Sequence, residues 1–268
     1  MLFDYGLKNW NSNWESINNF RKFSILNFNK DPYGDIDEFD WDSYNIQCFQ
    51  YNRLTNDYNT IRYLYNIINN GYYINRKKEK SMLINNVLEN YGFSFLSSGT
   101  NRKVYFSSQN PGIVLKVAID GEGVRANLRE WKNQYYLQPF ISKIFHCESN
   151  GLLMLEERVK AFKTFKEYAN AFNEIFIILL HYQENMKYFL EDVGTNYFKN
   201  WGLRYENFPV IVDFSEAFQY NPNKLKCTSK DKDTEEICGG DLEYDWKHGA
   251  NFIICNKCGK SYYATELV

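Results

Sequence analysis

The chain has 268 residues, of which 44% are hydrophobic and 18% aromatic, which is enough for a sizeable core and for more than one domain. Its 31 basic and 33 acidic side chains give a formal net charge of −2, which argues against a general binder of nucleic acid or of membrane surfaces. The N-terminus lacks the basic and apolar segments of a signal peptide, and the longest apolar run, IFIILL at 175–180, is too short to span a bilayer. We therefore expect a cytoplasmic protein whose six cysteines are metal ligands or free thiols rather than disulfides.

Composition divides the chain into three regions. Residues 1–75 are rich in Asn and Tyr and are expected to form a mainly helical extension, since apolar residues recur at helical spacing within 56–70. Residues 76–220 alternate between strand-like and helix-like runs. Residues 221–268 contain four of the six cysteines and are expected to form a separate small module.

The central region predicts an α+β domain. Strand-like runs occupy 93–99, 102–108, 112–120, 142–148 and 152–159. Helix-like runs occupy 78–91, 122–138 and 164–190, and a β-hairpin follows at 201–212. This order predicts an antiparallel sheet with one inserted helix, followed by further helices and the hairpin.

Two strands of this sheet contain residues that suit an anion site. Gly99 lies in a turn of small residues, where backbone amides can approach phosphate, although taken alone an ordinary hairpin turn is the better explanation. Alternation in IVLKVAI (113–119) places Lys116 on one face with Val114 and Ala118, and the larger apolar residues on the other. Lys116 either extends to water from an edge strand or reaches a phosphate beneath the turn.

The next helix carries an acidic residue that can hold such a lysine. Asn127 and Glu130 are three residues apart and therefore share a helix face. Taken in order, the glycine turn, Lys116 and Glu130 resemble the protein-kinase fold over residues 90–217, and above all the small kinase-like proteins encoded by bacteriophages. The resemblance implies a bilobal fold with a reduced C-lobe that binds ATP and magnesium.

The resemblance assigns a role to each matching position. SSGTNRKV stands in place of the glycine-rich loop and keeps only Gly99, because Ser97 and Arg102 replace the other two glycines. Val104 would lie against the base, and Lys116, paired with Glu130, would reach the phosphates. The implied adenine-binding hinge is MLEERV, which includes Glu156, Glu157 and Val159.

Asn200 and Asp213 stand at the two ends of the hairpin, thirteen residues apart. By resemblance both are magnesium ligands, and an amide oxygen with a carboxylate suits this hard cation. The alternative is a polar strand end with a structural aspartate.

The catalytic base is less regular. In the kinase pattern an Asp precedes the Asn by five positions, where this chain has Thr195, and the nearest Asp is Asp192, eight positions before Asn200. Asp192 can still act as the base if three residues loop out. Only thirteen residues separate Asp213 from Cys227, which leaves no room for an activation segment. The function expected is therefore a kinase-like phosphotransferase of unknown substrate, or alternatively a pseudokinase that serves as a protein-interaction or assembly module.

The third region resembles a zinc ribbon. Cys255 and Cys258 have the spacing of a zinc knuckle, Cys238 belongs to a second knuckle, and Cys227 completes it across an inserted polar loop. Four thiolates imply a structural zinc, while four free thiols are the alternative and His248 is a substitute ligand. The region has seven Lys, no Arg and eight acidic residues, which disfavours nucleic acid and favours a protein partner. A phage-encoded protein of this kind would act in the host-cell cytoplasm or in the virion.

Overall fold

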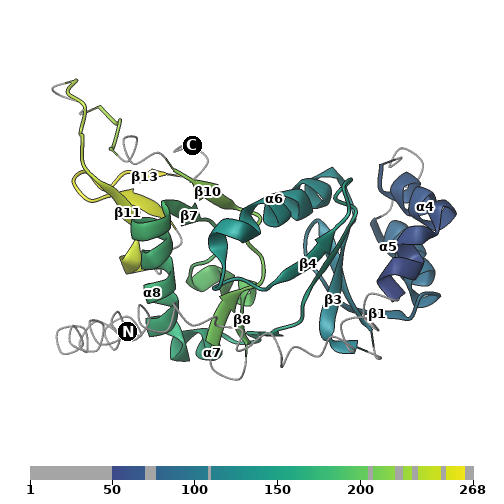
Figure 1. The fold of residues 1–268 in the computed structure, drawn as a ribbon. Helices are drawn as coiled ribbons and strands as arrows, with labels where there is room; N and C mark the ends of the chain where they lie inside the picture. The colour runs from purple at the N-terminus through teal and green to yellow at the C-terminus, as the bar shows by residue number, and fades with distance from the viewer. Residues whose placement is uncertain are drawn as a thin grey trace. The chain divides into compact units, whose positions relative to one another are not determined.

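The computed structural model describes residues 50–69, 77–107, 110–204, 208–220, 226–230, 235–248 and 252–262 (Figure 1). The chain divides into two compact units, 1–45 and 46–268, and all described residues lie in the second. Most of the predicted N-terminal extension, 1–75, lies outside the described residues. Among the helices that are described, none has the length and apolar character needed to cross a membrane.

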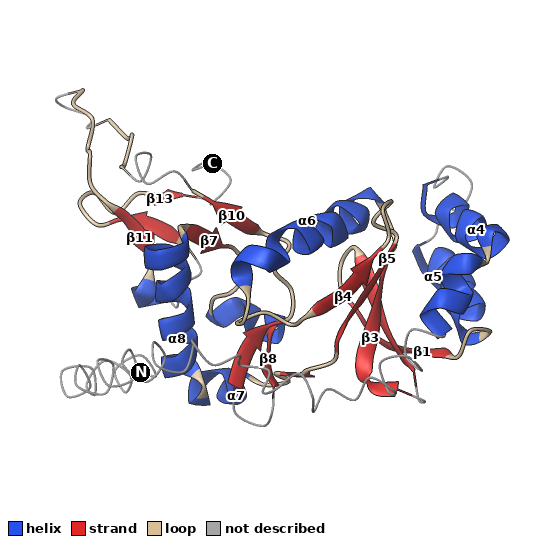
Figure 2. Ribbon diagram, in the orientation of Figure 1, coloured by secondary structure: helices blue, strands red, loops and turns tan. Residues whose placement is uncertain are grey.

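The predicted antiparallel sheet is present and has five strands (Figure 2). Its strands are β1 (Phe93–Ser98), β2 (Arg102–Ser107), β3 (Asn110–Ala118), β4 (Ile144–Cys147) and β5 (Leu153–Glu157). They pair in the order β1-β2-β3-β5-β4, and the inserted helix between β3 and β4 is α6 (Gly121–Leu137). The α+β class predicted from the sequence is therefore confirmed.

The two faces of this sheet differ as the alternation in β3 predicted. Ile113, Leu115, Val117 and Ile119 lie in one apolar cluster with side chains of α4 (Tyr58–Asn69) and α5 (Lys77–Glu89). The opposite face, which carries Lys116, is packed against α6. Burial of the first face fixes which residues of β3 point toward the second.

Helix α6 begins at a tight junction with the β1–β2 turn. The Asp120 side chain accepts a hydrogen bond from the Gly123 amide at 2.8 Å, which caps the first turn. A Cβ on Gly123 would stand 2.1 Å from the Asn101 carbonyl oxygen, so only glycine allows this approach. The junction sets the register of α6 and turns Asn127 and Glu130 into the protein.

The second half of the domain corrects one prediction. The helix expected over 164–190 is divided into α7 (Phe165–Asn170), α8 (Phe172–His181) and a π-helical turn, Tyr182–Met186. It ends at Lys187, whose φ of 60° is left-handed, and Tyr188–Leu190 form strand β7, which pairs with β10 (Ala217–Gln219). The prediction of helix over 188–190 is wrong because these apolar residues are paired with a distant strand, which periodicity alone cannot reveal.

The predicted hairpin consists of β8 (Trp201–Arg204) and β9 (Phe208–Ile211), with β6 (Lys160–Ala161) beside β8. A 3-10 helix, Thr195–Asn200, leads into it. Just past the Trp201–Ile211 pair, the Val212 amide donates to the Asn200 carbonyl oxygen at 2.8 Å. This bond brings together the two hairpin ends, and with them Asn200 and Asp213.

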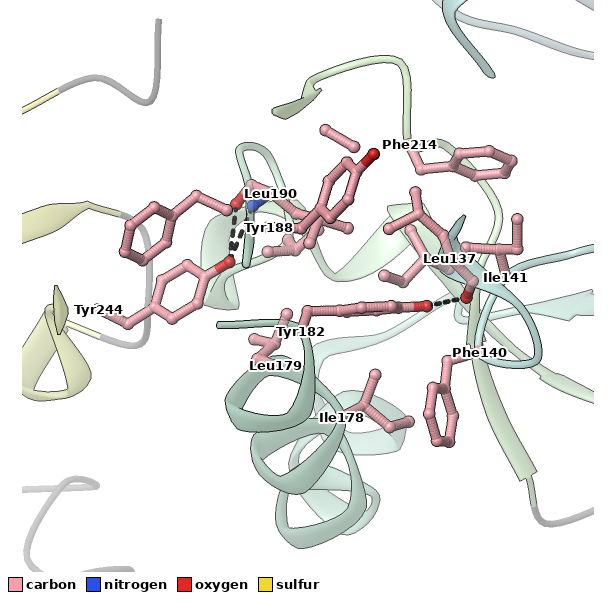
Figure 3. Packing of buried hydrophobic residues seen from close by; sticks show 14 of the residues in the cluster. Leu137, Phe140, Ile141, Ile178, Leu179, Tyr182, Tyr188, Leu190, Phe214 and Tyr244 are labelled. Atoms are coloured by element: carbon pink, nitrogen blue, oxygen red, sulfur yellow. Dashed lines mark hydrogen bonds between the residues drawn. The ribbon is translucent and has the colours of Figure 1, made fainter. Parts of the chain in front are cut away.

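The C-terminal ribbon has three strands, β11 (Leu242–Tyr244), β12 (Ile253–Cys255) and β13 (Ser261–Tyr262), with a short 3-10 helix, Trp246–His248, after β11. Its apolar side chains belong to the same buried cluster as α8 and β7 (Figure 3). The Tyr244 hydroxyl accepts a hydrogen bond from the Leu190 amide at 2.8 Å and lies 3.4 Å from the Leu190 carbonyl oxygen (Figure 3). The ribbon thus contacts the strand that leads to Asp192.

We predict that Tyr244→Phe destabilises the protein by about 1–3 kcal/mol, because the buried Leu190 amide loses its hydroxyl acceptor. Urea unfolding measures the change. Tyr135→Phe is the control, since Tyr135 is 76% exposed and its hydroxyl should contribute little. Equal stabilities of the two variants would contradict a structural role for the Tyr244 contact.

Candidate functional site

A cleft of about 860 Å³ opens on the α6 side of the sheet, between the β1–β2 turn, the segment after β5 and the hairpin region. It brings together most of the residues that the sequence singled out. Those that line it are Gly99, Val104, Lys116, Glu156, Glu157, Val159, Asp192, Asn200 and Asp213. Glu130 is fully buried behind this lining.

Lys116 and Glu130 form the expected ion pair. Lys116 Nζ lies 3.0 Å from Glu130 Oε2 and also donates to the Val212 carbonyl oxygen at 2.7 Å. Burial lowers the pKa of Lys116, but Glu130 and Glu156 raise it more, so the ammonium stays charged. Lys116 therefore joins β3 to α6 and to the residue before Asp213.

Arg102 is a second buried cation in this cluster. Its Nη2 lies 2.9 Å from Glu130 Oε1 and 2.7 Å from Asp213 Oδ1, and its Nη1 donates to Asn127 Oδ1 at 3.3 Å. The sequence pointed to Arg102 only as a missing glycine. The sequence signal that could have identified Arg102 as a site residue was an arginine in a turn expected to hold phosphate.

Asp213 lies at the edge of the cluster, with 41% of its side chain exposed. Burial raises its pKa, but Arg102 and Lys116 lower it more, and the net pKa lies well below the usual range. Glu130 Oε1 also accepts a hydrogen bond from the Phe214 amide at 3.2 Å. The carboxylate of Asp213 is therefore ionised, and the backbone that follows it is held by Glu130.

Glu156 differs from what its assignment to the hinge implied. Its side chain is buried, its Oε2 lies 2.6 Å from Lys116 Nζ, and the Ser142 hydroxyl donates to its Oε1. Burial raises the pKa of Glu156 to about 7. It is thus a third carboxyl group of the ion cluster, rather than a hinge residue that acts through its backbone alone.

The surroundings of Glu157 and of Gly99 are simpler than those of Glu156. The Glu157 carboxylate is bound by Arg204 Nε at 2.8 Å and by the Lys143 amide at 3.0 Å, so this side chain anchors the hairpin to β5. A Cβ on Gly99 would meet nothing closer than 3.7 Å. Packing within the chain therefore does not require a glycine at position 99. A requirement for glycine there would have to come from a bound molecule.

Asp192 and Asn200 meet although they are eight positions apart in the sequence. The 3-10 helix takes up the extra length, and Asn200 Nδ2 donates to the Asp192 carbonyl oxygen at 2.9 Å. Asp192 has a left-handed φ of 57°, which turns it into the cleft. Burial, with a smaller contribution from Asp213, raises the pKa of Asp192 above its ordinary value.

These residues suit a magnesium ion. Because Asn200 uses its Nδ2 within the chain, its amide oxygen is the atom that can face a cation, and Asp213 adds an ionised, part-exposed carboxylate. Glu216, which the sequence did not single out, also lines the cleft, and its carboxylate is bound by Arg129 at 3.1 Å. Arg102 occupies one oxygen of Asp213 and would have to share or release it.

The second candidate site is the cysteine cluster. The Sγ atoms of Cys227, Cys238, Cys255 and Cys258 all lie within 4.8 Å of one another. The distances Cys227–Cys258 and Cys238–Cys255 are 3.5 and 3.7 Å. A tetrahedral zinc with Zn–S bonds of about 2.3 Å would place its sulfurs roughly 3.8 Å apart, so these residues fit zinc.

Contacts around the cluster support a structural site. The amides of Lys257 and Cys258 each donate to Cys255 Sγ at 3.4 Å, as expected for a knuckle turn that stabilises a thiolate. His248 instead pairs with Asp245 at 2.6 Å and is not part of the cluster. Four sulfur ligands leave no open coordination position for a reacting water.

Comparisons with known proteins add little. No family model matches the sequence, and no curated protein matches it. Among solved structures, three structures of WbdD are similar at 13% identity, with TM-scores of 0.34, 0.34 and 0.32. One is a co-crystal structure with a kinase inhibitor, and one is described as that of a bifunctional kinase-methyltransferase. The matches cover 48%, 47% and 45% of this chain but only 34%, 33% and 31% of those chains. This likeness is too weak to assign a function.

We predict that the purified protein contains one zinc per chain and that Cys238→Ser loses it, because three sulfurs bind zinc more weakly than four. Metal analysis with a colorimetric chelator measures the stoichiometry. Cys147→Ser is the matched control, since Cys147 is a buried thiol outside the cluster. Zinc-free wild-type protein, or full zinc content in Cys238→Ser, would contradict the site.

Proposed function

We propose that the protein is an ATP- and magnesium-binding, kinase-like phosphotransferase with a structural zinc ribbon. The observation that carries this proposal is one cleft that holds the Lys116–Glu130 pair on one side and Asp192, Asn200 and Asp213 on the other. This is the order of functional groups that the protein-kinase resemblance implies.

Each group has a physical task in this proposal. Val104 and Val159 contribute to the cleft wall that would receive the base. Lys116 supplies positive charge for the phosphates, and Asn200 and Asp213 would hold magnesium, which neutralises phosphate charge during transfer. Asp192, with its raised pKa, would accept the proton of the attacking hydroxyl.

The segment that follows Asp213 limits how a phosphate acceptor could bind. Only three residues separate Asp213 from β10, which returns at once to pair with β7. No segment of the length that carries peptide substrates in protein kinases lies between them. The acceptor is therefore proposed to bind without an activation segment, and its identity is left open.

The second candidate function is a pseudokinase that acts as a protein-interaction module. The contact between Arg102 and Asp213 favours it, because a proposed magnesium ligand is already neutralised by the protein. The ribbon, whose residues favour a protein partner over nucleic acid, fits either function.

We predict that Mg-ATP raises the melting temperature of the wild-type protein and that Lys116→Met and Asp213→Asn abolish this rise, because they remove the phosphate cation and the metal carboxylate. Lys103→Met is the matched control, since Lys103 lies next to Arg102 on β2 but bonds to Ser81 and Asn85 on the other side of the sheet. Transfer from radiolabelled ATP in the same samples separates the two candidate functions. No stabilisation of the wild type at millimolar Mg-ATP would contradict the phosphotransferase and leave the interaction module as the function.

A further inference from the structure

Arg102 stands where the resemblance to kinases expects a glycine, at the start of β2. Its side chain is only 9% exposed, and its guanidinium faces two carboxylates, Glu130 and Asp213. The proposed function gives it no task. Burying an arginine together with two carboxylates costs desolvation free energy, because each charge must be removed from water.

The contact with Asp213 bears directly on metal binding. Arg102 Nη2 at 2.7 Å and the Ser215 hydroxyl at 3.2 Å both approach Oδ1 of Asp213. A divalent cation on this carboxylate would be repelled by the neighbouring guanidinium and would compete with it for the same oxygen.

Arg102 does not depend on Asp213 for its charge balance. Glu130 Oε1 at 2.9 Å and Asn127 Oδ1 at 3.3 Å would still bind the guanidinium after Asp213 was released. Asp213, with 41% of its side chain exposed, is the partner that can turn toward the cleft. The ion pair can therefore open without leaving a buried charge unpaired.

We propose that Arg102 competes with the divalent cation for Asp213 and so determines how much magnesium the cleft requires. This inference rests on the proposed function, because it takes Asp213 as a metal ligand. Magnesium would bind only when it replaces the guanidinium at Asp213, and the chain without metal would hold Asp213 neutralised by Arg102.

The test measures Mn²⁺, a paramagnetic substitute for Mg²⁺, by electron paramagnetic resonance of the free ion, without nucleotide. The samples are the zinc-loaded full-length wild type, Arg102→Gln, Arg102→Lys and Lys103→Gln. Arg102→Gln removes the competing charge, and Arg102→Lys retains a charge on a side chain that cannot reach both carboxylates with a planar fork. Lys103→Gln removes the same charge from the adjacent residue, which bonds to α5 outside the cleft.

We expect Arg102→Gln to bind Mn²⁺ at least about tenfold more tightly than the wild type, Arg102→Lys to bind with an intermediate affinity, and Lys103→Gln to match the wild type. If Arg102→Gln does not fold, Arg102→Lys alone decides, since a gain in affinity is still expected. Equal Mn²⁺ affinity in the wild type and the folded Arg102 variants overturns the proposal.

A second arm adds ATP with magnesium or without any divalent cation in the buffer, so that the ribbon zinc is not chelated, and follows the melting temperature. If the Arg102 variants gain Mn²⁺ affinity but no sample responds to ATP, the competition stands and the nucleotide function fails. If ATP stabilises the wild type while Mn²⁺ affinity is unaffected by Arg102, the function stands and the competition fails. Equal stabilisation of the wild type by ATP without and with magnesium would show that Arg102 replaces the cation instead of competing with it, and would overturn the proposal.

Discussion

The carboxylate of Glu130 is the group on which the cleft depends. It is fully buried and receives Lys116 from β3, Arg102 from β2 and the Phe214 amide from the segment after β9. A buried carboxylate without such partners would cost several kcal/mol, so these contacts are needed for the fold itself. One side chain of α6 thus fixes three other elements relative to one another and places Asp213 beside them.

Different contacts support the two sides of the cleft around Glu130. On the sheet side, α4 and α5 bury the apolar face of β3, which leaves Lys116 on the cleft face. On the other side, only three residues separate Asp213 from β10, and the ribbon adds its own apolar residues to the core. Tyr244 joins that ribbon to β7, two residues before Asp192. The fold and stability of the ribbon therefore affect the position of the proposed base.

Local patterns in the sequence predicted the parts of this arrangement that depend on neighbouring residues. Alternation in β3 gave the cleft face of Lys116, helical spacing gave the shared face of Asn127 and Glu130, and cysteine spacing gave the cluster at the C-terminus. The sequence could not show that Tyr188–Leu190 pair with a strand 29 residues further on, because that pairing satisfies the backbone from a distance. The partners of Arg102 and Glu156 were missed for the same reason, since each meets its ionic partners only after the sheet and α6 have formed.

Amide hydrogen exchange shows whether Glu130 holds the segment of Asp213 in place. In Glu130→Gln, which keeps the shape of the side chain but removes its charge, we expect faster exchange of the peptide containing Val212–Ser215, together with α6, while α4 and α5 remain as protected as in the wild type. Unchanged protection of Val212–Ser215 in a folded Glu130→Gln protein would show that the segment is held by contacts other than the buried carboxylate.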